Sequence, residues 1–460
     1  MLAAIAGSKL RLHVAAYSRT AIIVLSVGVV GCGGVAMRSL DLLQKLWQSL
    51  ASIAGKELGA ILAATIIALV CEVCRRLIRS VRWLVDYHRR LRRVQRDIGR
   101  ELRHGRAKEG KGLWLAEPVT PPHITLRPGL TPKVLVVANA KGGVGKTTVA
   151  ANVAARLAEL AMASQEKPLL LIDLDFQGTL STMAIHGQPA APSDDDPDSD
   201  ATYLISGDLT PENIVRTQKC ATYVGLTQNP HSSQARVQRW LRLITSHYDL
   251  AQAESRVMVE WLISDRKKDI RFRLRELLWS DTVVSNFSAV IIDCPPRFTT
   301  GAIQAFAAAT HVLIPTKLDY ASSEAVVTFA RQLELLRDSG ICWDGLKHIG
   351  VVATMVNAAA NVENVRIELD DKLSLSFNRG GVDGKTQCIG SATDIYENTI
   401  FRDAGGRGIA YFVMGDGQRT ARVKSAIQIL AHHVAREMSL PQGLQRYPLD
   451  EGFSAARMAV

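Results

Sequence analysis

The segment from Lys133 to Thr148, KVLVVANAKGGVGKTT, determines the fold of the chain. It begins with a short, continuous apolar run, as expected for a strand that is buried on both faces of a parallel sheet. A glycine-rich loop follows, after which apolar residues recur at helical spacing at Val149, Val153, Leu157 and Leu160. A strand, a glycine-rich loop and a helix in this order predict a phosphate-binding loop.

The residue types in this loop suit phosphate chemistry. Glycines let the backbone wrap around phosphate oxygens, while the N–H groups and the positive end of the helix hold the anion. Lys146 supplies a point charge to the β- and γ-phosphates, and the Thr147 hydroxyl can bind Mg²⁺. The plain motif has a glycine at position 140, where this chain has alanine. The predicted nucleotide-binding residues are Lys141, Gly142, Gly143, Val144, Gly145, Lys146, Thr147 and Thr148.

The loop, Asn-x-Lys-Gly-Gly-x-Gly-Lys-Thr-Thr, resembles the deviant phosphate loop of the ParA/MinD family of ATPases. PLLLIDLDFQG at 168–178 is similar to the second strand and switch I of that family, with Phe176 in place of the usual proline. Further similar segments are AVIIDCPP at 289–296 (Walker B strand and switch II), HVLIPTKLDYASS at 311–323 and IGVVATMVN at 349–357. The resemblance covers about residues 133–440. It implies an α/β P-loop NTPase fold, a mostly parallel sheet flanked by helices.

Three aspartates at strand ends complete the predicted site. Asp173 and Asp175 are separated by one residue at a strand end, and we expect them not to share one role. Asp293 follows three apolar residues at a strand end, where a carboxylate can hold Mg²⁺ through water. By resemblance, Asp175 positions the attacking water and Asp173 supports the Mg²⁺ shell. The predicted metal-binding residues are Thr147, Asp173 and Asp293.

Lys141 resembles the signature lysine of the family, which reaches the nucleotide of the partner subunit. A positive charge delivered across a dimer acts like an arginine finger. The resemblance therefore implies a homodimer formed on ATP binding and Mg²⁺-dependent ATP hydrolysis, with Lys141, Lys146 and Asp175 as catalytic residues. It further implies a role in DNA partitioning or intracellular positioning, with an activating or cargo protein that the sequence does not identify.

Composition and charge separate the N-terminal part from the rest. Hydrophobic residues make up 47% of the 460 residues and charged residues 22%, which excludes a wholly disordered or low-complexity chain. Seven cysteines are too sparse, and odd in number, for a disulfide framework. The net charge of +11 is concentrated between Arg75 and Lys111, where 14 Arg and Lys residues face four Asp and Glu residues.

Two apolar runs precede the basic segment. Thr20–Met37 has 18 residues without a formal charge, and as a helix it would extend ~27 Å, close to the ~30 Å hydrocarbon core. Leu58–Cys71 is shorter, and basic residues flank the pair on both outer sides. The positive-inside rule then predicts a transmembrane hairpin in the inner membrane of the cell, with the ATPase domain in the cytoplasm. A signal peptide, a buried helical pair and a misassigned start codon are the alternatives.

The basic segment shows helical periodicity, with apolar residues every seven positions from Val70 to Ile98. Its arginines favour contact with anionic lipid, and nonspecific DNA binding or a solvated helix face are the alternatives. A C-terminal helix predicted at 418–438 carries Arg419, Arg422 and Lys424. These residues could contact DNA or form a solvated helix face. The predicted organisation is a hairpin at 1–74, a basic helix at 75–112, a proline-rich linker at 113–132, the ATPase domain at 133–440 with a disordered insert at 187–200, and a tail at 441–460.

Two other functions compete with the ATPase hypothesis. A bacterial-type tyrosine kinase also joins a membrane hairpin to a phosphate-loop domain, but the tail here has only Tyr447 and no tyrosine cluster. A scaffold that binds nucleotide and membrane without hydrolysis is the second alternative. Intact Asp175 and Asp293 argue against the scaffold.

Overall fold

The computed structural model describes residue 45 and residues 55–104, 113–115, 119–185, 200–216, 239–263, 269–357, 362–377, 386–404, 407–414 and 417–445. The chain divides into two compact units, residues 1–89 and 90–460. The first predicted apolar run, Thr20–Met37, and residues 187–199 of the predicted insert lie outside the described residues.

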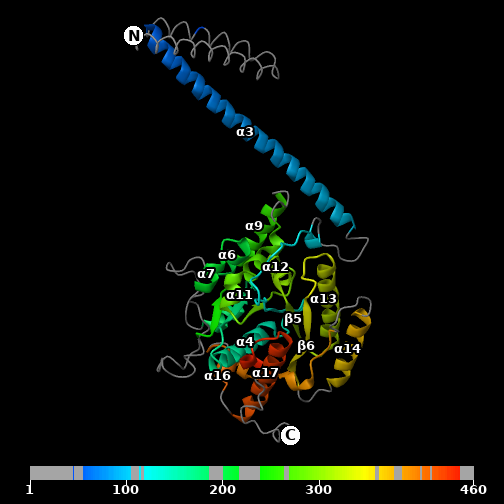
Figure 1. Ribbon diagram of the computed structural model, residues 1–460. Helices are drawn as coiled ribbons and strands as arrows, with labels where there is room; N and C mark the ends of the chain where they lie inside the picture. The colour runs from blue at the N-terminus through cyan, green and yellow to red at the C-terminus, as the bar shows by residue number, and fades with distance from the viewer. Residues whose placement is uncertain are drawn as a thin grey trace. The chain divides into compact units, whose positions relative to one another are not determined.

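A single 50-residue helix, α3 (Gly55–His104), contains both the second apolar run and most of the basic segment (Figure 1). Its Glu72 makes exposed ion pairs with Arg75, Arg76 and Arg79 at 3.3–3.5 Å. No helix in the part of the chain that the structure describes is long and apolar enough to cross a membrane. The first predicted span, Thr20–Met37, lies outside this part of the chain, so the membrane hairpin stays a prediction.

Seven strands form one parallel sheet in the order β3-β2-β4-β1-β5-β6-β7. Strands β1, β2, β4 and β5 are buried along their whole length, as the continuous apolar runs predict. The mostly parallel sheet expected from the sequence is thus confirmed. The strands are β1 (Val134–Val137), β2 (Leu169–Asp173), β3 (Leu241–Ile244), β4 (Ala289–Asp293), β5 (His311–Thr316), β6 (Lys347–Val356) and β7 (Ile395–Tyr396).

Helices cover both faces of this sheet because successive side chains of a strand point to opposite sides. Val134 and Val136 pack into the cluster that includes α12 and α13, whereas Leu135 and Val137 pack into the cluster with α4 and α17. The described helices that follow β1 are α4 (Lys146–Ala163), α5 (Thr179–Ala184), α6 (Ala201–Ser206), α7 (Pro211–Arg216), α9 (Asp249–Ile263), α10 (Arg273–Leu278), α11 (Asp281–Asn286), α12 (Thr300–Ala308), α13 (Tyr320–Asp338), α14 (Glu363–Phe377), α15 (Ile400–Ala404), α16 (Ala410–Val413) and α17 (Gln418–Glu437). Short 3₁₀ turns occupy η1 (Leu113–Leu115), η2 (Ile270–Phe272), η3 (Ser391–Thr393) and η4 (Gln442–Gln445).

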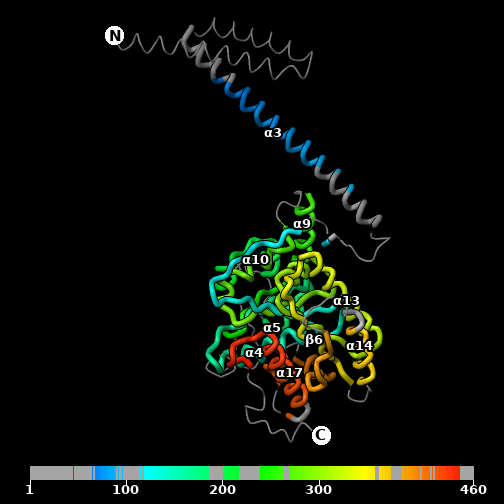
Figure 2. The backbone as a smooth tube through the Cα atoms, turned by 45° about the vertical axis from the view of Figure 1, so that its right-hand side comes forward, coloured from blue at the N-terminus to red at the C-terminus, as the bar shows by residue number. Residues whose placement is uncertain are grey.

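The segment predicted as a linker lies on the ATPase domain. We call residues 113–132 the strap; Figure 2 shows its described part, in cyan, running along the outside of the domain past α10. Val119 and Ile124 pack against the core, and Arg127 donates to Asp281 from its backbone N (2.9 Å) and its Nε (2.8 Å). The strap is therefore part of the packed domain, not a spacer.

Two other predicted boundaries also fall inside packed structure. Leu444 of η4 is fully buried in the core although it belongs to the predicted tail. Asp200, predicted as the last residue of the disordered insert, is buried and caps α6 by accepting a hydrogen bond from Thr202 N. It also accepts a hydrogen bond from Nε2 of His247 at 2.8 Å. Apolar packing and capping therefore extend the domain beyond the limits predicted from motifs.

Candidate nucleotide-binding site

The glycine-rich loop connects the central strand β1 to α4 at the carboxyl edge of the sheet. Gly143 and Gly145 have φ values of 68° and 77°, in the left-handed region that favours glycine. A Cβ atom added at Gly142 or Gly143 would meet nothing within 4 Å. The loop thus presents open space beside backbone that a side chain does not cover, as a phosphate cradle requires.

Lys146 lies at the first position of α4 and is only 7% exposed. Its Nζ donates a hydrogen bond to the backbone oxygen of Lys141 at 3.0 Å. Burial lowers the pKa of Lys146, while the carboxylates of Asp293 and Asp175 act in the opposite direction. Lys146 therefore interacts electrostatically with both aspartates.

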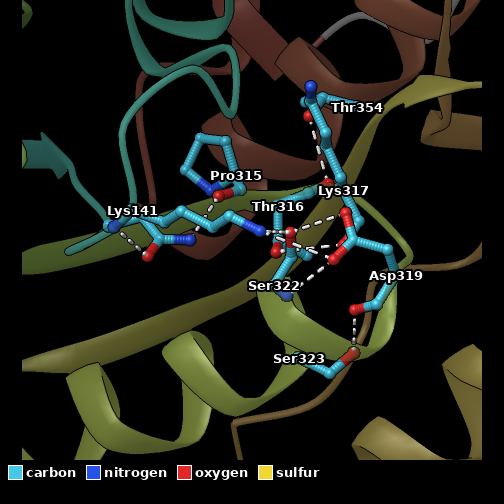
Figure 3. Close-up of polar contacts among 9 residues, drawn as sticks. Lys141, Pro315, Thr316, Lys317, Asp319, Ser322, Ser323 and Thr354 are labelled. Carbon is cyan, nitrogen blue, oxygen red and sulfur yellow. Dashed lines mark hydrogen bonds and ion pairs between the residues drawn. The ribbon is translucent and has the colours of Figure 1, made fainter.

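Lys141 points across the edge of the sheet toward the start of α13 (Figure 3). Its Nζ donates to Ser322 Oγ at 2.7 Å and forms an ion pair with Asp319 at 3.5 Å. Asp319 in turn caps α13 by accepting from Ser322 N at 2.7 Å. Burial opposes ionisation of Asp319, but the hydrogen bonds from Ser322 and the charge of Lys141 lower its pKa below the usual value. The ammonium group of Lys141 is thus held by Ser322 and Asp319 of its own chain.

Polar side chains within apolar strands fix the loop to its neighbours. Asn139 Nδ2 donates to Pro315 O at 2.8 Å, which joins the segment after β1 to β5. Thr354 of β6 places its hydroxyl 2.9 Å from Val144 O and 3.1 Å from Thr316 O. The sequence analysis did not predict these hydrogen bonds of Asn139 and Thr354. A threonine or asparagine near the carboxyl end of an otherwise apolar strand was the sequence feature that could have indicated them.

Asp293 ends β4 and is 1% exposed. Burial together with the charge of Asp173 raises the pKa of Asp293 well above its usual value, while the Thr147 side chain acts in the opposite direction. The Oδ1 atom of Asp293 has no hydrogen-bond partner among the described residues. A buried carboxylate oxygen without a partner, beside a threonine hydroxyl, fits a Mg²⁺ ion or one of its waters.

Asp173 lies directly beside Asp293 in the register of β2 and β4. Its carboxylate accepts from Ser181 N (2.9 Å), Ser181 Oγ (2.7 Å) and Asp175 N (3.0 Å), and burial raises its pKa to about 6. Asp175 is partly exposed and accepts from Gln177 N at 3.1 Å. Both carboxylate oxygens of Asp173 therefore accept hydrogen bonds that hold switch I in place. Any support that Asp173 gives to the Mg²⁺ shell, as predicted from the sequence, would therefore be indirect.

Replacing Gly178, which begins α5 just after switch I, is expected to destabilise the domain. Gly178 has φ +59°, and a Cβ there would lie 2.8 Å from Ser246 O. Gly178→Ala therefore adds a backbone clash to the cost of a left-handed conformation, and we expect a loss of about 2–4 kcal/mol in the free energy of unfolding. Denaturant titration would measure it.

The matched control is Gly129→Ala. Gly129 has φ +85°, but an added Cβ would meet nothing within 4 Å. This variant carries the conformational cost alone, about 1 kcal/mol. Equal losses in the two variants would show that the contact with Ser246 is not a constraint on switch I.

Comparisons with known proteins identify relatives of the domain that carries the glycine-rich loop. A family model described as an AAA domain matches residues 132–341. The chromosome partitioning protein ParA of Myxococcus xanthus is 29% identical over 236 residues, 51% of this chain and 69% of that protein. The sporulation initiation inhibitor protein Soj of Bacillus subtilis is 27% identical over 254 residues, 52% of this chain and 81% of that protein. Apo McdA of Cyanothece aligns in three dimensions with a TM-score of 0.46 and 18% identity, over 67% of this chain and all of that one. The family model and the two curated relatives confirm the resemblance predicted from the loop and switch motifs.

Proposed function

We propose a function for this chain from its membership of the ParA/MinD family of P-loop ATPases, to which it belongs by its phosphate-loop and switch motifs, the family model and the curated relatives. It binds ATP with Mg²⁺, forms a homodimer in that state and hydrolyses the ATP as a timer of association. The cycle serves DNA partitioning or intracellular positioning. The carrying observation is that the buried Lys146 interacts with the buried Asp293 and the partly exposed Asp175 beside an open glycine loop.

The roles of the residues follow from their positions. The loop amides and Lys146 hold and neutralise the phosphates, because Lys146 lies at the helix start with its ammonium group directed back into the loop. Thr147 and the unpartnered oxygen of Asp293 would hold Mg²⁺, which supplies charge neutralisation at the β- and γ-phosphates. Asp175, partly exposed near Lys146, orients the attacking water.

Lys141 acts on the nucleotide of the partner subunit. In its own chain it is held by Ser322 and Asp319, and the two charged side chains are 35% and 48% exposed. An ion pair this exposed contributes at most about 1 kcal/mol. The contact is therefore weak enough to break when a second protomer brings phosphates within reach of the lysine.

The N-terminal region tethers the ATPase domain to the inner membrane. The two apolar runs and the basic residues on their outer sides support this part of the proposal. The described arginine side chains of α3, among them Arg82, Arg92 and Arg96, are exposed and suit an anionic lipid surface. Nucleic acid is the alternative partner because phosphate contacts use the same side chains.

Fractionation tests the tether. We expect the full chain to sediment with the inner membrane and a chain that lacks residues 1–75 to remain in the supernatant, because the apolar runs are then absent. Nuclease treatment of the pellet separates the two partners: release of the full chain by nuclease would favour nucleic acid. Recovery of both chains in the supernatant would contradict the membrane tether.

A further inference from the structure

Trp114 joins the strap to the domain through three contacts on different sides of the residue. Its indole Nε1 donates to Phe298 O at 3.0 Å. Its backbone oxygen accepts from Arg271 Nη1 at 2.7 Å. Its ring stacks on Trp261 of α9, with centroids 6.2 Å apart and an interplanar angle of 12°. A partly buried residue that precedes the phosphate-loop strand is thus packed against the core of the domain.

The partners of Trp114 are themselves firmly held. Arg271 is fully buried, forms an ion pair with Asp269 at 2.6 Å and lies over the Trp261 ring at 5.1 Å. Buried charge pairs and stacked aromatic rings hold their geometry because neither can be exchanged for water contacts without cost. Trp114 therefore rests on a rigid platform on one side. The remaining contact, to Phe298, is made to the loop that follows Asp293.

Phe298 belongs to the loop that connects Asp293 to Thr299, the N-cap of α12. We refer to residues 293–299 as switch II. The Phe298 ring packs against Phe306 and Phe329, with distances between ring centroids of 5.6 Å and 5.9 Å. The backbone oxygen of Phe298 is the group to which Trp114 of the strap donates its hydrogen bond. Loops of this kind change position with the phosphate and metal state of the site. Any shift of Phe298 O must either stretch the bond to Trp114 or move the strap.

We propose that Trp114 is a positioning residue for switch II, and that its bond to Phe298 couples the nucleotide state of the site to the strap and thus to the chain that precedes it. This inference rests on the nucleotide binding proposed above. The coupling is reciprocal. If a bound nucleotide changes the equilibrium between the formed and broken Trp114–Phe298 bond, the bond changes the affinity for that nucleotide by the same factor. A single hydrogen bond limits that factor to roughly tenfold.

The test uses the full chain labelled with 5-fluorotryptophan and observed by ¹⁹F NMR. The Trp114 resonance is identified as the one missing from Trp114→Phe, which keeps an aromatic ring on Trp261 but has no N–H to donate. We expect this resonance to differ between the ADP·Mg²⁺ and ATPγS·Mg²⁺ complexes. We further expect Trp114→Phe to change the ratio of the two affinities, measured by calorimetry, by roughly two- to tenfold.

Trp279→Phe is the matched control. Trp279 Nε1 also donates to a backbone oxygen, that of Ala308, at the opposite end of α12 from switch II. Its loss should leave the ratio of ADP to ATPγS affinity unchanged, because a general loss of stability affects both complexes alike. The ratio therefore separates a positioning role from a merely structural one.

Two outcomes would overturn the inference. Saturable binding of both nucleotides with a Trp114 resonance that is identical in the two complexes would overturn the coupling alone. The coupling would also be overturned if Trp114→Phe and Trp279→Phe changed the ratio of ADP to ATPγS affinity by equal factors. Absence of binding to the unaltered chain would instead overturn the proposed function on which the coupling rests.

Discussion

Lys146→Ala is expected to lower the affinity for ATP·Mg²⁺ by about 100-fold or more and to remove ATP turnover. Lys146 is 7% exposed, and its ammonium group is the charge that the helix start directs into the glycine loop. Hydrogen bonds between charged groups contribute about 1.5–3 kcal/mol each, and removal of one partner of a buried charge pair costs about 3–5 kcal/mol. Calorimetric titration and a phosphate-release assay would measure the two effects.

Lys133→Ala is the matched control for Lys146→Ala. Lys133 also has a pKa lowered by burial, but it precedes β1 at the amino edge of the sheet, whereas the loop is at the carboxyl edge. It carries the same change of charge without contact to the loop, so we expect nucleotide affinity to stay within a few-fold of the unaltered chain. Equal losses in both variants would place the nucleotide elsewhere, or would show that overall charge alone governs binding.

The sheet could be predicted from the sequence because its strands are short and apolar throughout. The runs that begin at Lys133, Pro168 and Ala289 each lead into a buried strand whose end lies within a few residues of the predicted one. The separate roles proposed for Asp173 and Asp175 could not be read from alternation, because alternation places residues two positions apart on the same face of a strand. β2 ends at Asp173, which is fully buried, whereas Asp175 lies beyond the strand and is partly exposed.

Contacts between distant parts of the chain could not be predicted in this way. The bond from Trp114 to Phe298 joins residues 184 positions apart, and periodicity carries no information about such pairs. Proline content indicated an extended strap, but extension alone does not show whether a segment stays in solvent or packs. The hydrogen bonds of Ser181 to Asp173 likewise depend on the turn at Gly178, which places α5 against the end of β2.

Lys141→Ala is expected to retain nucleotide binding within a few-fold but to lose about 10³-fold or more in turnover. The Lys141 ammonium group contacts Ser322 and Asp319. In its own chain the substitution therefore removes only these two contacts between the glycine-rich loop and the start of α13. A charge supplied in trans to a phosphoryl transfer is worth about 10³–10⁵ in rate. Asp319→Asn is the control, because it weakens the hold on Lys141 but keeps the lysine, and we expect a change of at most about fivefold.

Mixing two inactive variants distinguishes action in trans from action within one chain. In a mixed dimer of Lys141→Ala and Asp175→Asn, one site combines an intact Asp175 with the intact Lys141 of the partner subunit, and the other site has both defects. Random pairing of equal amounts should then restore about one quarter of the unaltered turnover, because half of the dimers are mixed and one of their two sites is complete. If Lys141 served its own nucleotide, every site would carry one defect and the mixture would stay inactive. Recovery can therefore arise only if Lys141 leaves Asp319 and Ser322 and crosses the dimer interface.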